Sequence, residues 1–404
     1  MPIRPSPPQA SFVLPWDDAG APPPVEALEA ARREHGDTFV VVSGGTVYCF
    51  VFSPTALRAF YDLPERDASK GLADFRMLAR KLPQEVFLGR RTFAHDLFGA
   101  GMVEGYLDNV DWAIATVLDE LGDAGTFDAF ALARRLGHHV GIACWFGREA
   151  PIDALIADLD ALDGADAFVA PHTMANIDFA AERSALGHIV EQVGVLLTTP
   201  RAPSFLNDIA ARWDAVDSPS PDAVTGATYD LVLLHIATMT NLFAALGWTL
   251  AYTVLDDVDA ERVGDAAQEA IRLGQRSIML REVMRPIIFD DGSTRYEIDR
   301  GVQLATMLPL TNLANGRANF DVDRAPQPGL TTTTFGHGSH RCPAQRFSMQ
   351  TITRAVTQLR NDFALTPGFT SVTPLPMQIG GVARPAHPCP IDYRSKLKDT
   401  SRCV

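Results

Sequence analysis

The stretch TFGHGSHRCPAQRF, residues 334 to 347, decides how this sequence is interpreted. It gathers a cysteine, Cys342, with two histidines and two glycines, and the residues that follow it, QRFSMQTITRAVTQLRNDF, have helical periodicity. A cysteine at the first turn of a helix meets unpaired backbone N–H groups and the positive end of the helix dipole, and both stabilise a thiolate. The pattern therefore favours a chemical role for Cys342 over the alternative of a buried structural thiol.

Two kinds of metal site can be compared at this loop. Zinc is a poor fit, because His337 and His340 lie close to Cys342 but no second group of Cys or His follows at ligand spacing. Glycine lets the backbone approach a flat ligand closely, and Phe335 and Gly336 open the loop. A thiolate presented in this way is typical of the axial ligand of a haem iron.

Composition excludes several classes of partner. The chain has 404 residues, a hydrophobic fraction of 47% and a formal net charge of −14. Nucleic acids and anionic membranes select for a basic face, so neither is expected as a partner. The five cysteines are odd in number and scattered, which argues against a disulfide framework and predicts a cytoplasmic protein.

The chain divides into an arm and one large domain. Residues 1–24 hold eight prolines, which predicts an extended arm or a disordered tail. Residues 25–404 show no internal repeat and no linker, so a single, mainly α domain with a small β part is expected. Helical spacing runs from about residue 106 to 196 and again from 261 to 286, and residues 38–53 and 376–394 are predicted as hairpins.

One segment imitates a membrane span. Residues 231–255 carry no formal charge over 25 positions, which is long enough to cross a bilayer. Polar residues such as His235 and Asn241 interrupt the segment, acidic residues lie at both ends, and no flanking Lys/Arg bias is present. We therefore expect a long helix buried in the core and no transmembrane segment.

A second motif, E-x-x-R, occurs as Glu282 and Arg285, about sixty residues before Cys342. An acid and a base at this spacing on a helix are commonplace, so the order of the motifs carries the meaning. NFDVDR, with Phe320 and Arg324, lies between this pair and the cysteine.

These motifs together resemble the cytochrome P450 family of haem-thiolate enzymes, whose cysteine loop reads F-G-x-G-x-[HR]-x-C-x-G where this chain has FGHGSHRCPA. The resemblance covers nearly the whole chain. It implies a cytochrome P450-like fold with haem b between the cysteine loop and the central helix, and Cys342 as the axial iron ligand. It also implies that Phe335 and Gly336 contact the cofactor and that His340 pairs with a haem propionate.

The same resemblance implies further cofactor contacts. Arg295, about ten residues after Arg285, is expected to reach a propionate, and Arg324 is expected to join the Glu/Arg pair in a buried network. Residues 98–130 contain no Lys, Arg or His, so His95, with Arg91 as the other candidate, is the expected basic contact over the haem edge.

The central helix departs from the family pattern. Monooxygenases of this family show A-G-x-[DE]-T, an acid and an alcohol that relay protons to dioxygen. With Trp248 as the anchor, Thr240 takes the acid position and Asn241 takes the alcohol position; a slip of one residue would put Met239 and Thr240 there instead. Thr240 and Asn241 are the predicted catalytic residues, and in either register the relay lacks a carboxylate.

Three functions remain open. The first is an atypical monooxygenase acting on a lipophilic small molecule. The second is a peroxide-dependent or rearranging enzyme without a redox partner, because NLFAALGW resembles prostacyclin-synthase-like and allene-oxide-synthase-like members. The third is a haem sensor without turnover. A ferredoxin-type electron donor has weak support, because Glu104, Asp108 and Asp111 are acidic where such donors need a basic surface.

Overall fold

The computed structural model describes residues 3–4, 6–15, 18, 20–163, 178–199, 202–216, 219–314, 316–324 and 333–396. Its helices are α1 (Pro24–His35), α2 (Pro54–Asp62), α3 (Lys70–Leu78), α4 (Ala94–Leu97), α5 (Ala100–Asp119), α6 (Ala129–Trp145), α7 (Ile152–Asp163), α8 (Ala180–Leu197), α9 (Phe205–Arg212), α10 (Pro221–Leu255), α11 (Val263–Gly274), α12 (Leu308–Asn312) and α13 (Gln345–Asp362). Its strands are β1 (Ile3–Arg4), β2 (Gln9–Ala10), β3 (Thr38–Ser43), β4 (Thr46–Val51), β5 (Ala68–Ser69), β6 (Ala124–Asp128), β7 (Ile278–Val283), β8 (Ile287–Asp290), β9 (Arg295–Ile298), β10 (Gln303–Met307), β11 (Phe363–Pro367) and β12 (Pro390–Ser395).

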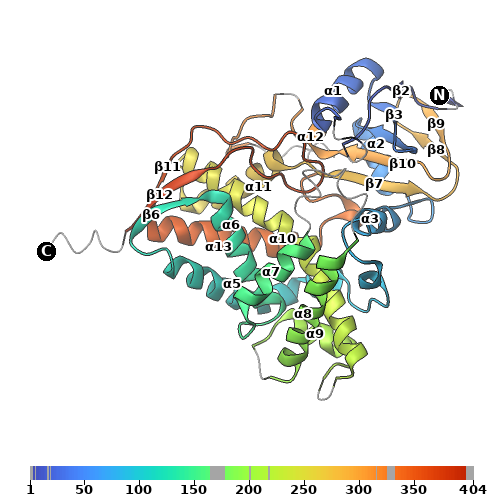
Figure 1. Cartoon of the computed structure of the whole chain (residues 1–404). Coiled ribbons are helices and arrows are strands. Elements are labelled where there is room, and N and C mark those ends of the chain that lie inside the picture. Colours follow the sequence, from blue (N-terminus) through green and yellow to red (C-terminus); the bar gives the residue numbers. More distant parts are fainter. Residues whose placement is uncertain are drawn as a thin grey trace.

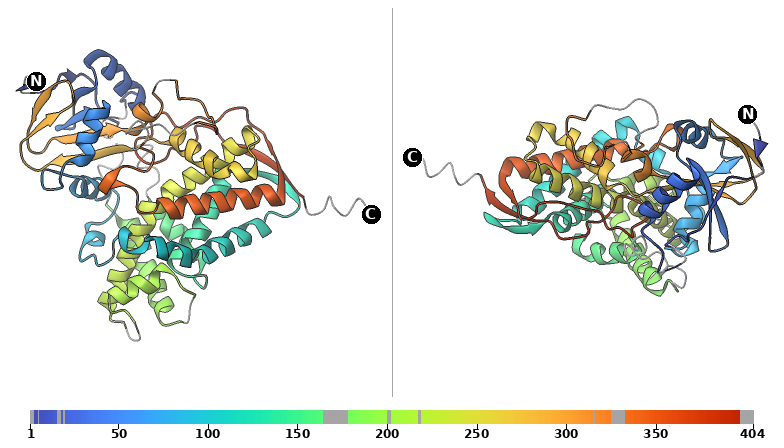
Figure 2. Two further views of the ribbon diagram at one scale, coloured as in Figure 1. Left: turned by 180° about the vertical axis from the view of Figure 1, so that it is seen from behind. Right: turned by 90° about the horizontal axis from the view of Figure 1, so that it is seen from above.

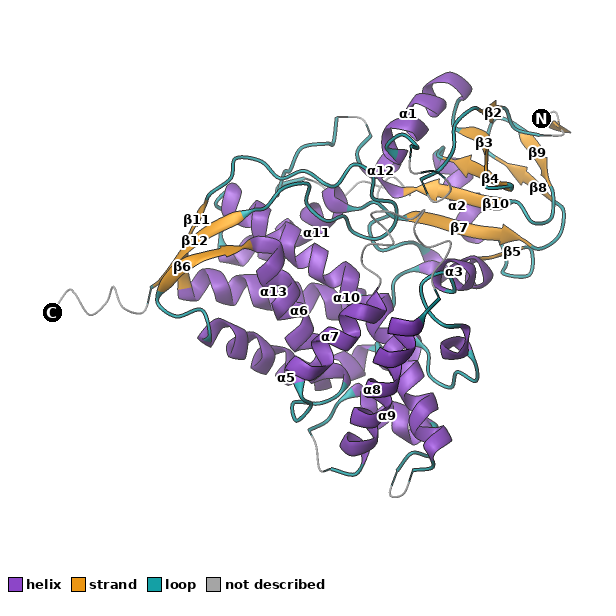
Figure 3. Cartoon of the chain, in the orientation of Figure 1, coloured by secondary structure: helices purple, strands orange, loops and turns teal. Residues whose placement is uncertain are grey.

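Helices form the body of the molecule and strands lie at two of its ends (Figures 1 and 3). At one end is a six-stranded sheet in the order β2-β3-β4-β10-β7-β5, with the β1-β9-β8 sheet beside it. At the other end is the β11-β12-β6 sheet. The predicted fold class, mainly α with a small β part, is confirmed.

Local chemistry explains the first hairpin and the arm. Gly44 and Gly45 both have positive φ, at 53° and 76°, which is the conformation that a two-residue turn between β3 and β4 requires. The arm supplies two short strands, because β1 pairs in parallel with β9 and β2 pairs in parallel with β3. The part of the arm that the structure describes therefore lies extended along the sheets.

Helix α10 runs through the centre of the helical body (Figures 1 and 2) and packs against α6, α8, α9, α11 and α13. It is long and apolar enough to cross a membrane, but 83% of its most apolar window is buried inside the protein. This burial agrees with the predicted core helix.

Two predicted elements are wrong. The helix expected to continue to residue 286 ends at Gly274, and residues 278–283 form strand β7 in the six-stranded sheet. The last hairpin pairs β11 with β12, while Gly380 and Gly381 lie in the long connection between them. The helix predicted across residues 164–177 lies outside the described residues.

Candidate functional site

A cavity of about 690 Å³ separates α10 from the cysteine loop. Its lining is mostly apolar, with a few charged and polar groups. The residues that line it are Glu65, Lys70, Gly71, Asp74, Ala94, His95, Phe98, Leu234, Ala237, Thr238, Asn241, Leu242, Ala245, Ile271, Gln275, Ser277, Met279, Leu308, Thr334, Phe335, Gly336, Ser339, His340, Arg341, Cys342, Pro343, Ala344, Ser348, Ile352 and Val382. Six of the eight predicted site residues are therefore brought together here, and Thr240 and Arg295 are not among them.

Cys342 lies three residues before the start of α13. Its backbone N–H donates to the carbonyl of Phe335 at 2.7 Å, which closes the loop. Burial raises the pKa of the Cys342 thiol, while the backbone N–H groups of Ala344 and Gln345 and the charge of Lys70 act to lower it. The N–H donors at the helix N-terminus therefore stabilise the thiolate form of Cys342. A metal cation bound to the sulfur would stabilise the thiolate further and offset the effect of burial.

Gly336 is required by the shape of the loop. Its φ is +74°, and a Cβ at this position would come within 2.5 Å of the carbonyl oxygen of His340. Gly338 also has positive φ, at +58°, but a Cβ there would meet nothing within 4 Å. The tight turn at Gly336 brings the backbone close to the cavity, as a flat ligand requires.

Basic side chains collect at one edge of the cavity. His340 has its Nε2 atom 3.7 Å from Glu65 Oε1, and burial together with the charge of Arg281 lowers its pKa. Lys70 pairs with Asp74 on the same side. His95, on α4, is exposed and also lines the cavity, whereas Arg91 stacks on Trp213 and pairs with Asp214 elsewhere.

Asn241 projects from α10 into the cavity. Its Oδ1 atom accepts a hydrogen bond from the backbone N–H of Val382 at 2.9 Å, and Val382 belongs to the connection that precedes β12. Because a backbone N–H only donates, this bond identifies Oδ1 as the acceptor and leaves Nδ2 as the donor that the amide offers to the cavity. The cavity face of α10 also includes Ala237 and Thr238, one turn earlier.

Thr240 points to a different neighbour. Its hydroxyl donates to the carboxylate of Asp163, the last residue of α7. Met239 packs near Gly141 of α6 and is buried. Of the two predicted relay residues, Asn241 lines the cavity and Thr240 does not. The alternative register, in which Met239 and Thr240 would face the cavity, does not agree with the structure.

The buried Glu/Arg network is present, but it uses a different E-x-x-R motif. Glu269 and Arg272 of α11 form a two-armed ion pair at 2.6 and 2.7 Å, and Arg324 donates to Glu269 at 2.8 Å. Glu282 and Arg285, the predicted pair, do not form it. Glu282 lies in β7 beside Arg76, and the largely exposed Arg285 pairs with Asp67. The correction follows from β7, because an i, i+3 pair meets only on a helix.

The choice between the E-x-x-R motifs also affects which arginine is predicted to reach a haem propionate. Arg295 lies in β9, and the cavity lining does not include it. Arg281, nine residues after Arg272, is fully buried beside the cavity edge and donates to the backbone carbonyls of Phe60 and Ala68. Counting from Arg272 instead of Arg285 would have pointed to Arg281.

Comparison with known proteins identifies the fold. No protein-family model matches the sequence, and no curated protein sequence matches it. Among solved structures, a cyanobacterial cytochrome P450, CYP120A1 with bound retinoic acid, aligns with a TM-score of 0.72 over 97% of this chain and 99% of that one, at 17% identity. The chain has the cytochrome P450 fold.

In this P450-like fold, neighbouring carboxylates offset the positive charges on the surface of α13. Figure 2 shows α13 at the front of the rear view, flanked by α5 and α11. Its arginines pair within the chain, each with one carboxylate: Arg346 with Glu104, Arg354 with Asp111 and Arg360 with Asp257. The positive charges of these three arginines are therefore offset within the chain.

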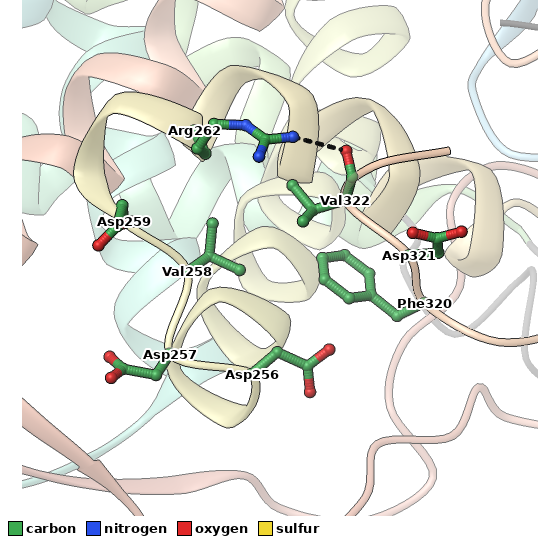
Figure 4. Close-up of a pocket in the computed structure, with 8 residues that line it drawn as sticks. All are labelled: Asp256, Asp257, Val258, Asp259, Arg262, Phe320, Asp321 and Val322. Carbon is green, nitrogen blue, oxygen red and sulfur yellow. Dashed lines mark hydrogen bonds between the residues drawn. The ribbon is translucent and has the colours of Figure 1, made fainter. Parts of the chain in front are cut away.

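A second hollow, of about 570 Å³, adjoins this surface at the end of α10 (Figure 4). Carboxylates surround it, and Arg262 crosses it to donate to the carbonyl of Val322 at 3.1 Å. Burial raises the pKa of Asp256, one of the lining residues. The hollow adds negative charge beside α13 and is separate from the cavity that contains Cys342.

Proposed function

We propose that this chain binds haem b in the 690 Å³ cavity with the Cys342 thiolate as axial ligand, and that it is an oxidoreductase acting on a lipophilic small molecule. The observation that carries this proposal is the position of Cys342. Its sulfur lies at the N-terminus of α13, under two N–H groups, in an apolar cavity whose opposite wall is α10.

The other residues of the cavity fit this cofactor. Phe98, Ile271, Phe335 and Ile352 provide apolar surface for a macrocycle. His95, His340 and Lys70 are basic groups at the lining that would hold two propionates. Lys70 already has a carboxylate partner in Asp74, so propionate binding would compete with that pair.

Bound haem would supply electron-transfer and oxygen chemistry at its iron, and the chain's own groups set how that chemistry proceeds. Cys342 would hold the iron and would raise its electron density. Asn241 would donate a hydrogen bond from Nδ2 to an oxygen atom in the cavity, and its amide holds no proton that it can release. Val382 fixes that orientation through Oδ1.

Monooxygenation is the first form of the activity that we propose. One dioxygen, two electrons and two protons convert R–H into R–OH and one water. The electrons come from a one-electron protein donor of the ferredoxin class, and the protons must reach the cavity from solvent. The third candidate is a haem sensor, which would bind haem in the same cavity and form no product in either assay.

Peroxide-dependent oxidation or rearrangement of a peroxide is the second candidate. Two observations favour it. Asn241 offers a hydrogen-bond donor that has no acidic proton, and the arginines of α13 are paired with carboxylates of the same chain. Such an enzyme receives its O–O bond from the substrate and needs no electron donor.

Turnover in two parallel assays tests this proposal. The haem-loaded protein is given lipophilic substrates with a ferredoxin system, NADPH and dioxygen, or with peroxide or a fatty-acyl hydroperoxide alone. Product that forms in the first assay and not in the second supports monooxygenation. Product that forms in the second assay and not in the first supports the peroxide chemistry. Asn241→Ala is expected to lower turnover at least about tenfold in whichever assay is active, since a positioned hydrogen-bond donor contributes at least on that scale.

The apolar cavity lining supports a lipophilic substrate class. Its walls are mainly apolar, and the structurally similar CYP120A1 was solved with retinoic acid, a lipophilic carboxylic acid. We propose an apolar substrate for this chain and place fatty acids and retinoids in the first panel. A cytoplasmic location fits a soluble electron donor and the scattered cysteines.

A further inference from the structure

Four aromatic side chains lead away from the cavity, one after the other. Phe98 lines the cavity, and its ring centroid lies 6.0 Å from that of Trp145, the last residue of α6. The ring of Trp145 lies 4.5 Å from that of Phe205, the first residue of α9. Phe205 in turn lies 4.2 Å from Tyr106 of α5. We call these four residues the aromatic chain.

The cysteine helix contacts the same rings. Phe347 of α13, five residues after Cys342, has its ring centroid 5.2 Å from that of Trp145 and 5.7 Å from that of Phe98. Trp145, Phe205 and Phe347 are fully buried. Aromatic rings in tilted or edge contact are also ordinary core packing, so the polar groups of the aromatic chain decide whether it has a further role.

The indole N–H of Trp145 has no acceptor. Among the residues that the structure describes, none accepts a hydrogen bond from Trp145 Nε1. A buried tryptophan usually satisfies this donor, and leaving it unsatisfied costs stability. Without a base beside it in that part of the protein, an oxidised Trp145 would keep its proton and would draw an electron from Tyr106, across Phe205.

Tyr106 has the proton acceptor that Trp145 lacks. Its hydroxyl donates to a carboxylate oxygen of Asp208, on α9. Burial, this hydrogen bond and the charge of Asp208 all raise the pKa of Tyr106, so the phenol keeps its proton at neutral pH. Loss of an electron makes a phenol strongly acidic, and Asp208 is in position to take that proton. Asp208 is half-buried, so this end of the aromatic chain reaches solvent.

We propose that the aromatic chain carries electrons from Tyr106 to the cavity, and that it gives this protein a second activity, the one-electron oxidation of phenols at Tyr106 and Asp208. The inference rests on the proposed haem, which hydrogen peroxide would oxidise. Its substrates differ from those of the proposed function, because a phenol that reacts at Asp208 does not enter the cavity.

Electrons and protons balance over one hydrogen peroxide and two phenols. Peroxide takes two electrons from the haem-loaded protein, and the aromatic chain returns them one at a time. In each transfer Tyr106 gives an electron to Trp145 and its proton to Asp208. A phenol then supplies an electron to Tyr106, Asp208 returns the proton, and the phenol releases its own proton to solvent. Reduction of the peroxide consumes two protons, so the products are two waters and two phenoxyl radicals.

Electron paramagnetic resonance tests this electron path without turnover. The haem-loaded protein is mixed with hydrogen peroxide alone and frozen rapidly. The wild type is expected to give a tyrosyl radical signal, and Tyr106→Phe should lose it. The matched control is Tyr393→Phe, which should keep the signal. Tyr393 also packs against aromatic rings, those of Phe127 and Phe363, but its hydroxyl donates to the carbonyl of Leu121 and none of these residues lines the cavity.

The rate of guaiacol oxidation by hydrogen peroxide is the second readout. Asp208→Asn keeps a hydrogen-bond acceptor for Tyr106 but removes the base, so the rate should fall at least about tenfold. Trp145→Phe keeps an aromatic ring but removes the readily oxidised indole, and it should lower both the radical signal and the guaiacol rate. Asp208→Asn also serves if Trp145→Phe folds poorly, because Asp208 lies outside the buried core. The thiolate-haem spectrum of Asp208→Asn should match that of the wild type, which separates loss of the electron path from loss of the cofactor.

Three results would overturn the inference: a haem-loaded wild type without a tyrosyl signal, a signal that persists unchanged in Tyr106→Phe, or equal guaiacol rates in the wild type and Asp208→Asn. Each of them would leave haem binding by Cys342 intact. Failure of the proposed function is a separate outcome, namely a protein that forms no thiolate-ligated haem in the absorbance spectrum recorded first.

Discussion

The ion pair of α11 gives the sharpest quantitative prediction. The side chain of Arg272 is 4% exposed and donates to Glu269 with two nitrogens, at 2.6 and 2.7 Å, and to the carbonyl of Asn312 at 2.6 Å. Arg272→Ala leaves Glu269, which is 7% exposed, with Arg324 as its remaining partner. Removing one member of a buried pair costs about 3–5 kcal/mol, a large part of the 5–15 kcal/mol that stabilises a typical domain.

The matched control is Arg285→Ala, the arginine of the E-x-x-R motif that the sequence analysis had selected. Its side chain is 61% exposed and its pair with Asp67 is worth at most about 1 kcal/mol. Urea unfolding followed by circular dichroism measures both variants. A large fall in the midpoint for Arg272→Ala and a small fall for Arg285→Ala is expected. Equal falls for the two variants would refute the assignment of the network to α11.

Three further predictions concern the loop, the core and the surface. Gly336→Ala should abolish haem retention measured by absorbance, because its Cβ would meet the carbonyl oxygen of His340, whereas Gly338→Ala should keep it; equal retention would contradict the steric argument. Burial lowers the pKa of His235 to about 3, below its unfolded value of about 6.5. Between these two pH values the unfolded chain binds a proton that the folded chain does not. The free energy of unfolding should therefore fall as pH falls from about 6.5 towards 3, by up to about 1.4 kcal/mol per pH unit. His235→Gln should flatten this part of the unfolding profile, and an unchanged slope would count against it. Replacing Glu104, Asp111 and Asp257 together by their amides should free three arginines and raise the ferredoxin-driven rate severalfold at low salt; an unchanged rate would show that this face does not dock the donor.

Sequence patterns located the parts of the site that depend on local chemistry. Cys342, Gly336 and His340 belong to one short loop, so their proximity follows from chain connectivity. The β3–β4 hairpin and the core helix α10 follow from paired glycines and from a long uncharged segment. Each of these features can be seen within about thirty residues.

The wrong predictions concern segments whose local sequence fits more than one structure, so that tertiary contacts decide between them. The sequence contains four E-x-x-R motifs, and of the three between α10 and the cysteine loop only the one at Glu269 and Arg272 lies on a helix, in AAQEAIRLG. The predicted motif, at Glu282 and Arg285, begins in IMLREV, which pairs with β10 as a strand. Counting about ten residues from Arg285 led to Arg295, whereas the same count from Arg272 leads to Arg281.

Asp163 shows the limit of sequence patterns most clearly. It occurs in an acidic, helical segment whose carboxylates look alike, and nothing local distinguishes it from Asp158 or Asp160. Its hydrogen bond with Thr240 depends on packing of α7 against α10, which brings together residues 77 positions apart. Such a partner is seen only when the helices are placed in space.

The absorbance spectrum of the haem-loaded protein, reduced and exposed to carbon monoxide, tests the central claim most directly. With Cys342 as the axial ligand, the wild type is expected to give the long-wavelength Soret band of a thiolate-ligated haem. Cys342→Ala should lose that band, while Cys144→Ala, which replaces a buried cysteine of α6 that does not line the cavity, should retain it. A thiolate-type band that persists in Cys342→Ala would contradict the account.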